Sequence, residues 1–159
     1  MVVEKRFLEN IVSVGIRRAG PDDLDSIQEV ENGSYDHPWS GGLLKEGMDN
    51  PRSLSFVATD GLDHGIRGFI LNLLVVDELH VLNIAVLPAY RRRGIGNSLL
   101  VTSINAAKQL GATAVFLEVR RSNIKALTLY IQHDFKVIGV RRGYYSDNGE
   151  DALVMKKSL

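Results

Sequence analysis

The chain has 159 residues, of which 45% are hydrophobic and 24% charged, and its formal net charge is zero. This length predicts a single domain over residues 1–159 that can bury one core. The neutral balance argues against a dedicated nucleic-acid binder, because such domains usually carry a basic excess. The chain has no cysteine, which excludes disulfides, thiolate metal ligands and a cysteine nucleophile.

The opening residues lack the uninterrupted apolar segment of a leader peptide, and no long uncharged apolar stretch follows them. We therefore expect a cytoplasmic protein with no membrane partner. Residues 1–12 are expected to form a loosely held extension of the domain.

The elements can be predicted in chain order from hydrophobic periodicity and from helix start and stop signals. After a strand over 12–18, Gly20-Pro21 opens a helix, because a proline there lacks only an N–H that would have no partner. Asn32-Gly33 is expected to break that helix. Ser40 then caps a short helix that ends near Asn50-Pro51. The remaining predicted elements are strands over 55–59, 67–76 and 78–87, a helix over 94–110, a strand over 114–119, a helix over 123–133, and strands over 136–139 and 152–156.

The order of these elements predicts the fold class. Short turns join the second, third and fourth strands, which favours antiparallel pairing, whereas a helix joins the fourth and fifth and favours a parallel crossover. We expect an α/β fold of the α+β type, with a mixed central sheet of about seven strands and helices on both faces. Ligands bind such sheets beyond the carboxyl ends of strands where the connectivity diverges. Here those ends are Val86 and Val119.

The run Arg91-Arg92-Arg93-Gly94-Ile95-Gly96 stands between a predicted strand and a predicted helix. A helix start offers backbone N–H groups without partners and partial positive charge, and glycines let an anion approach the backbone. The P-loop pattern is excluded because no lysine follows Gly96. The dinucleotide pattern is excluded because Leu99 stands where a third glycine is needed. Read alone, the run fits a phosphate-binding turn as well as it fits a capped helix behind a solvated basic stretch.

Arg-x-x-Gly-x-Gly resembles the acetyl-CoA signature of the GNAT superfamily of N-acetyltransferases. Within it the chain is most similar to the RimI-type protein N-terminal acetyltransferases, including the archaeal alpha-amine acetyltransferases, over roughly residues 14–156. One departure is Asp134-Phe135 in place of the usual Gly-Phe, which alters a helix C-cap rather than the chemistry. The other matching segments are His37-Pro38-Trp39-Ser40 (the family has Phe-Pro-Trp-Ser), Asn83-Ile84-Ala85-Val86, Leu117-Glu118-Val119-Arg120, Ser122-Asn123, Leu129-Tyr130, Tyr144-Tyr145 and Asp151-Ala152.

The resemblance implies an acetyltransferase that uses acetyl-CoA by direct attack in a ternary complex, with no metal. The backbone N–H groups of residues 92–97 would bind the pyrophosphate, and arginine side chains would add charge. The strand around Val86 would pair with the pantetheine arm and offer an N–H to the oxyanion. Asn123 would bind a pantetheine amide, a role compatible with a helix N-cap. The implied cofactor-binding residues are Ile84, Ala85, Val86, Arg91, Arg92, Arg93, Gly94, Ile95, Gly96, Asn97, Asn123 and Tyr130.

Glu118 is the candidate general base by this resemblance, and strand alternation places it on one face with Phe116 and Arg120. The alternative for Glu118 is a surface glutamate paired with Arg120 or Arg121. His80, on the adjacent strand, is the second candidate base, although a strand histidine on its own is more often structural.

Tyr130 is the candidate general acid, which would deliver a proton to the coenzyme A sulfur. It lies two helical turns beyond Asn123 and hence on nearly the same helix face. The alternative is a tyrosine of the core.

Tyr35 and Trp39 on one loop, and Tyr144 and Tyr145 on another, are expected to wall the acceptor site. The favoured acceptor is the N-terminal α-amine of a protein, ribosomal or other; the alternatives are a polyamine, an aminoglycoside or a lysine side chain. An open groove would suit a peptide and a closed acidic pocket a small amine. A third hypothesis is a non-catalytic CoA-binding or ribosome-associated module. We expect no nucleic-acid site and a monomer or weak dimer, with ribosome association as a further hypothesis.

Overall fold

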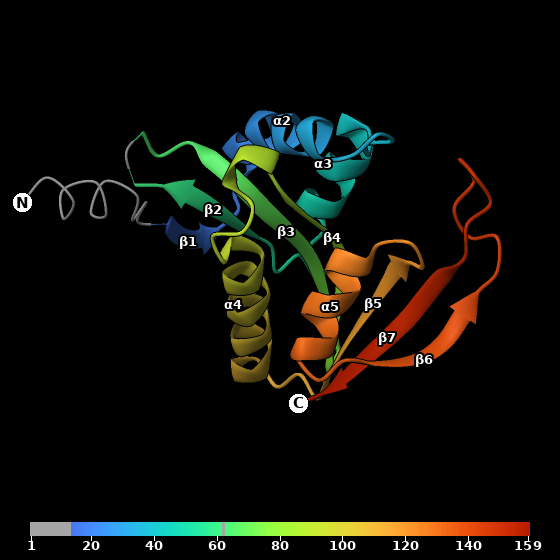
Figure 1. Ribbon diagram of the computed structural model, residues 1–159. Helices are drawn as coiled ribbons and strands as arrows, with labels where there is room; N and C mark the ends of the chain where they lie inside the picture. The colour runs from blue at the N-terminus through green and yellow to red at the C-terminus, as the bar shows by residue number, and fades with distance from the viewer. Residues whose placement is uncertain (1–13, 62) are drawn as a thin grey trace, which may run out of the picture.

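The computed structural model describes residues 14–61 and 63–159, and the expected extension over 1–12 lies outside them. These residues form one seven-stranded sheet in the order β1-β2-β3-β4-β5-β7-β6 (Figure 1). Among the described strands only the β4–β5 pair is parallel, which confirms the predicted mixed sheet. The strands are β1 (Val14–Arg18), β2 (Phe56–Asp60), β3 (Ile66–Val75), β4 (Glu78–Val86), β5 (Ala114–Arg120), β6 (Lys136–Arg141) and β7 (Ala152–Ser158).

Helices cover both faces of the sheet, as predicted. One core lies under α2 (Leu24–Ser34) and α3 (Gly41–Asp49), and the other lies under α4 (Ile95–Gln109) and α5 (Ile124–Gln132) (Figure 1). Two short 3-10 turns, η1 (Pro21–Asp23) and η2 (Pro88–Tyr90), precede α2 and follow β4. The α2/α3 core contains no residue of β5, β6 or β7. β5 and β7 contribute residues only to the α4/α5 core, so their other face is not covered by α2 or α3 in these cores.

The predicted break of the first helix at Asn32-Gly33 is wrong, because α2 continues to Ser34. Gly33 does not end the helix; it allows the helix to pack closely against Leu87. A Cβ on Gly33 would lie 3.1 Å from a methyl carbon of Leu87, closer than side chains normally approach. Glycine therefore lets the last turn of α2 sit directly on the segment that follows β4.

A β-bulge in β4 and the end of its pairing with β5 lie next to each other. Leu71 of β3 pairs with Asn83, but Asn72 pairs with Val81, so Leu82 is the extra residue of the bulge. Parallel pairing of β4 with β5 ends at Val81 and Leu117. Beyond that row no described pair joins the two strands, and we call the separated ends, residues 82–86 and 118–120, the β4–β5 split.

The bulge reverses the two faces of β4. Val81 packs in the α4/α5 core, whereas Ala85, four residues later, packs in the α2/α3 core, although strict alternation would put both on one face. Asn72, opposite the bulge, donates from its side-chain amide to the Ser103 hydroxyl of α4 at 2.9 Å. This buried bond fixes α4 to the sheet at the level of the split.

Candidate active site

The backbone between β4 and α4 forms a concave set of N–H groups. Arg92 and Gly94 both have left-handed backbone conformations, with φ of 61° and 78°. Left-handed residues alternating with others form a nest, in which successive N–H groups point to one side. The first intrahelical bond runs from Ser98 N–H to Gly94 O at 2.9 Å, so residues 95–97 lack intrahelical acceptors. The N–H groups fit an anion such as a pyrophosphate, and the binding of pyrophosphate by this run stays a prediction.

Gly96 lies between the two sides of the split. A Cβ placed on it would be 3.9 Å from Val86 Cγ2 of β4 and 3.9 Å from Leu129 Cδ2 of α5. The cradle therefore opens toward the space between the end of β4 and α5, and a larger side chain at Gly96 would project there. Ile95, next to it, is buried in the α4/α5 core and anchors the helix start.

The arginine side chains take different positions around the cradle. Arg91 turns back along the chain, where its Nε donates to Val86 O at 3.0 Å and its Nη2 to Ser34 O at 3.4 Å. The guanidinium of Arg93 lies over the ring of Tyr90 at 5.2 Å. In this structure Arg91 therefore brings its charge to the carboxyl end of β4.

The edge of β4 that faces the split belongs to Ile84 and Val86. Leu87 N–H donates to a carbonyl of β3 at 2.9 Å, so by alternation the polar backbone groups of Ala85 also point to β3. Those of Ile84 and Val86 point away from β3. The hydroxyl of Tyr35 donates to Ile84 O, and that of Ser34 to Val86 O at 3.3 Å. Side chains thus satisfy the carbonyls of this strand edge, while the N–H groups of Ile84 and Val86 face the split.

Tyr130 is part of the core and lies near two other phenols. Its side chain is 4% exposed, and its ring packs against Phe135 at 5.6 Å between centroids. Burial raises its pKa well above the ordinary value, and the nearby phenols of Tyr35 and Tyr145 add to this effect. Burial also raises the pKa of Tyr35 and that of Tyr145 to about 12 each. Three tyrosines from α5, the α2–α3 loop and the β6–β7 loop therefore converge in protonated form.

Glu118 lies on the face of β5 opposite the α4/α5 core, as alternation predicted. Its Oε1 forms an ion pair with Arg141, at 2.6 Å from Nε. The phenol of Tyr144 also donates to Glu118, and this bond raises the pKa of Tyr144. The predicted alternative, a pair with Arg120 or Arg121, is wrong, because those arginines bind acidic residues of the β6–β7 loop.

His80 shares this face with Glu118. It pairs in register with Phe116 of β5 and stacks on its ring at 5.5 Å, while its Nε2 lies 3.0 Å from a carboxylate oxygen of Glu78. Phe116 precedes Glu118 by two residues, so both candidate bases stand on one surface. Glu118 belongs to the split, whereas His80 lies in the part of β4 that is still paired with β5.

The two predicted walls contact each other. Arg120 binds Asp147 with two hydrogen bonds of 2.7 and 3.1 Å, and its guanidinium lies 3.8 Å from the ring centre of Tyr145. Asp147 in turn lies 3.6 Å from Nε2 of His37 on the α2–α3 loop. Arg120 therefore positions Tyr145, and His37 stands where the two loops meet.

Sequence reasoning missed Glu31, whose side chain fixes the α2–α3 loop. Glu31 is 1% exposed; one oxygen accepts from Trp39 N–H at 2.8 Å and the other from Asn83 Nδ2 at 3.0 Å. Burial raises its pKa. The sequence did contain a signal for Glu31, which lies on the same apolar helix face as Ile27 and Val30. A charged residue on such a face is rarely buried without a partner, so it indicates a specific polar contact.

The two asparagines of the predicted set have structural partners. The side chain of Asn123 caps α5 by accepting from Ala126 N–H at 3.1 Å, which confirms the N-cap role. The side chain of Asn97 lies 2.6 Å from Nε2 of His133, which links the first turn of α4 to the end of α5. Asp134, which stands where the family has glycine, adopts a left-handed backbone with φ of 64° just after α5, as a C-cap glycine would.

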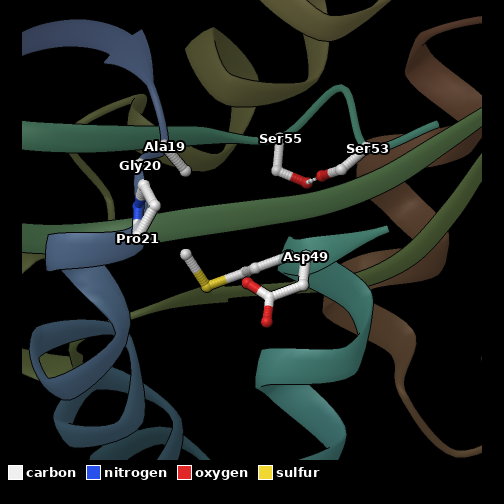
Figure 2. Close-up of a pocket in the computed structure, with 7 residues that line it drawn as sticks. Ala19, Gly20, Pro21, Asp49, Ser53 and Ser55 are labelled. Atoms are coloured by element: carbon white, nitrogen blue, oxygen red, sulfur yellow. Dashed lines mark hydrogen bonds between the residues drawn. The ribbon is translucent and has the colours of Figure 1, made fainter. Parts of the chain in front are cut away.

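A separate small pocket lies between η1, α3 and the start of β2 (Figure 2). It encloses about 40 Å³ and is lined by Pro21, Met48 and the hydrogen-bonded pair Ser53 and Ser55, among others. Its one acidic residue, Asp49, is paired with Lys45. This pocket lacks the candidate acid, the candidate base and the N–H cradle, all of which lie at or beside the split.

The comparisons with known proteins agree with this geometry. The chain belongs to the acetyltransferase (GNAT) family, whose model matches residues 24–135. The ribosomal protein bS18-alanine N-acetyltransferase of Escherichia coli strain K12 is 34% identical over 135 residues, covering 84% of this chain and 89% of the relative. Its crystal structure matches with a TM-score of 0.86 at 32% identity, over 92% of this chain and 94% of that one. The N-alpha-acetyltransferase of Saccharolobus solfataricus is 33% identical over 157 residues, covering 91% and 92%.

These findings confirm the predicted fold class and the predicted GNAT membership. Acetyltransferases of this family take their acetyl group from acetyl-CoA, and the N–H cradle and the β4 edge provide groups that fit its pyrophosphate and its amide-containing arm. The roles of the individual residues remain predictions.

We expect Gly96→Val to abolish acetyl-CoA binding while the domain stays folded, because the added methyl groups project between Val86 and Leu129. Calorimetry on the folded variant measures this directly. Gly47→Val is the matched control. Gly47 is a glycine within α3, away from the split, and its Cβ would lie 3.8 Å from the side chain of Leu71 in β3. Unchanged affinity in a folded Gly96→Val protein would remove the cradle from the site.

Proposed function

We propose that this protein transfers the acetyl group of acetyl-CoA to the N-terminal α-amine of a protein or peptide. The observation that carries the proposal is the state of the acidic groups around Glu118. Asp147 and Glu150 are bound to Arg120, and Asp151 lies 3.8 Å from Arg121. Glu118 is therefore the one of these four acidic residues whose partner, Arg141, is not an arginine of β5 or its end. A site with one such carboxylate suits a single α-ammonium better than a polyamine or an aminoglycoside, which carry several cationic groups.

The surroundings of Glu118 also favour a chain-like acceptor. Arg141 and Tyr144, which contact Glu118, are exposed, so an acceptor can extend away from the amine into solvent. The relatives named for N-terminal acetylation share about a third of their residues with almost the whole chain. Both considerations support a peptide rather than a small enclosed amine.

The residues at the split fit four tasks in such a reaction. The N–H groups at the start of α4 bind the pyrophosphate, and acetyl-CoA supplies the activated acetyl group. The N–H groups of Ile84 and Val86 orient the acyl arm and stabilise negative charge on the acetyl oxygen. Glu118 takes a proton from the incoming amine, directly or through water. Tyr130 donates to the departing sulfur, and its raised pKa keeps the phenol protonated across the neutral range.

The deciding experiment for the acceptor compares three kinds of amine. The protein is incubated with acetyl-CoA and short peptides that carry a free α-amine, with the same peptides N-terminally blocked but containing lysine, and with spermidine or kanamycin. We expect acetylation of the free α-amine alone, located by mass spectrometry. Turnover of only the small amines, or only of lysine, would replace this proposal by the corresponding alternative.

Tyr130→Phe keeps the ring packing against Phe135 and removes only the phenolic hydroxyl. We expect kcat to fall by roughly 10²–10⁴-fold with little change in KM, because a general acid acts in the transition state. Steady-state kinetics with a peptide acceptor measure this loss. Tyr90→Phe removes a phenol outside the split and should retain wild-type turnover. If Tyr130→Phe does as well, Tyr130 is a core residue only.

Glu118→Gln and His80→Ala distinguish the two candidate bases. A free α-amine has a pKa near about 8, so the neutral amine becomes available without a base as pH rises. The Glu118→Gln variant should therefore be slow at neutral pH and recover activity at higher pH, and His80→Ala should have a small effect. A crippled His80→Ala beside a Glu118→Gln enzyme with an unchanged rate and pH profile would reverse the two assignments.

Several coarser expectations belong to the same proposal. We propose one catalytic domain that works in the cytoplasm as a monomer or weak dimer, without a metal, on ribosomal or other proteins. Within the part of the chain that the structure describes, no helix is long and apolar enough to cross a bilayer.

A further inference from the structure

Arg141 reaches Glu118 from two strands away. On the face that bears Glu118, the row through Glu118 runs over Val154 of β7 to Gly139 of β6, where there is no side chain. Arg141 lies in the next row and pairs with Ala152 of β7. Because neighbouring strands are about 4.8 Å apart, the backbones of β6 and β5 are separated by roughly 10 Å, and the side chains of Arg141 and Glu118 extend toward each other over β7.

The end of this long side chain is lightly held. The Arg141 side chain is 58% exposed and that of Glu118 is 27% exposed, and they meet at 2.6 Å. The other contact of the guanidinium is the ring of Tyr144, 5.9 Å from its centre. Ion pairs of this kind contribute only about 0–1 kcal/mol, because screening and lost side-chain entropy offset the attraction. A second cation can therefore replace the guanidinium at little cost.

A guanidinium is a poor permanent partner for a base. Arginine does not give up its proton, and while it is paired with Glu118 it occupies the position from which the carboxylate would take a proton from the amine. An α-amine has a pKa near about 8, so at neutral pH most acceptor molecules arrive as ammonium ions with the same charge as the guanidinium. Exchange of one cation for the other leaves the charge at Glu118 unchanged.

We propose that Arg141 holds the place of the acceptor's ammonium group: the guanidinium pairs with Glu118 in the free enzyme and swings into solvent when the acceptor's α-ammonium takes its position. The inference rests on the proposed function and names the amine-binding position of that site. After the exchange, one N–H bond of the ammonium breaks and its proton passes to the Glu118 carboxylate. This step leaves a neutral amine and a neutral carboxylic acid, while Arg141 keeps its own proton.

Other charged groups near Glu118 already have partners. Arg120 is bound by Asp147 and Glu150, and His80 lies against Glu78. Other ionisable groups on this face include the phenols of Tyr144 and Tyr145 and the ammonium of Lys156, which lies over the ring of Phe116 at 5.5 Å. Lys136 of β6 pairs in register with Lys156 and so lies in the same row, two strands from Phe116. Arg141 is therefore the cation whose removal should change the environment of Glu118 most.

The kinetic test uses Arg141→Ala, Arg141→Lys and the control Arg142→Ala, which removes one charge from the adjacent position. With a peptide acceptor and saturating acetyl-CoA, Arg141→Ala should lower the peptide KM by up to about fivefold, the equivalent of a pair worth at most about 1 kcal/mol. Arg141→Lys and Arg142→Ala should keep the wild-type peptide KM.

The same substitution in a Glu118→Gln background separates displacement from a general effect. There Arg141→Ala should leave KM unchanged, since no ion pair remains to be broken. A KM that rises or stays constant in the Arg141→Ala single variant overturns the proposal. So does an equal effect of this substitution with and without Glu118.

A binding measurement distinguishes this inference from the proposed function. The Nε–H signal of Arg141 is followed by NMR in the presence of CoA, while a peptide with a free N-terminus is added. The signal should shift from its ion-paired to its solvent-exposed position, whereas the N-acetylated form of the same peptide should have no effect. An unchanged signal with bound peptide contradicts the placeholder role even if acetylation occurs. Displacement by amines without any peptide turnover would instead contradict the proposed acceptor.

Discussion

The separation of β4 from β5 after the row Val81–Leu117 is the constraint on which the site depends. Two parallel strands that stop pairing expose backbone groups on both edges, and unpaired buried backbone groups are costly. The bulge at Leu82 makes the separation possible, because it turns the rest of β4 and exchanges its faces. The carbonyls exposed on β4 are then satisfied by Tyr35, Ser34 and Arg91.

The split has a different electrostatic character at each end. On the side of α4, backbone N–H groups and the helix start favour an anion. On the opposite face of β5, Glu118 favours a cation and is occupied by Arg141. Protonated phenols lie near the split, at Tyr35, Tyr130 and Tyr145. An anionic donor and a cationic acceptor can thus approach from opposite sides and meet at a place where proton donors are already present.

Rigidity around the split comes from polar contacts that are buried or paired. Glu31 ties the α2–α3 loop to β4 through Trp39 and Asn83. Arg120 ties the β6–β7 loop to β5 and supports the ring of Tyr145. Because both loops are held to the strands that form the split, the groups they carry are positioned by the sheet itself.

Local patterns predicted the parts of the site that local physics determines. The order of strands and helices, the N–H cradle at Gly94 and Gly96, and the outward face of Glu118 all follow from spacing within one segment. The partner of Glu118 could not be predicted in this way. Arg141 lies near Glu118 only because of the register in which β5, β7 and β6 pair. The continuation of α2 through Gly33 was missed for a similar reason. Glycine is needed there because the side chain of Leu87, far away in sequence, packs against this position.

Amide-resolved hydrogen exchange tests the central role of the split most directly. If an acyl-CoA arm pairs with the free edge of β4, addition of CoA should slow exchange at Ile84 and Val86 and at the N–H groups of residues 95–97. Ala85, whose backbone already points to β3, should change little. Protection confined to the start of α4, or appearing only around the pocket between η1 and α3, would contradict the account.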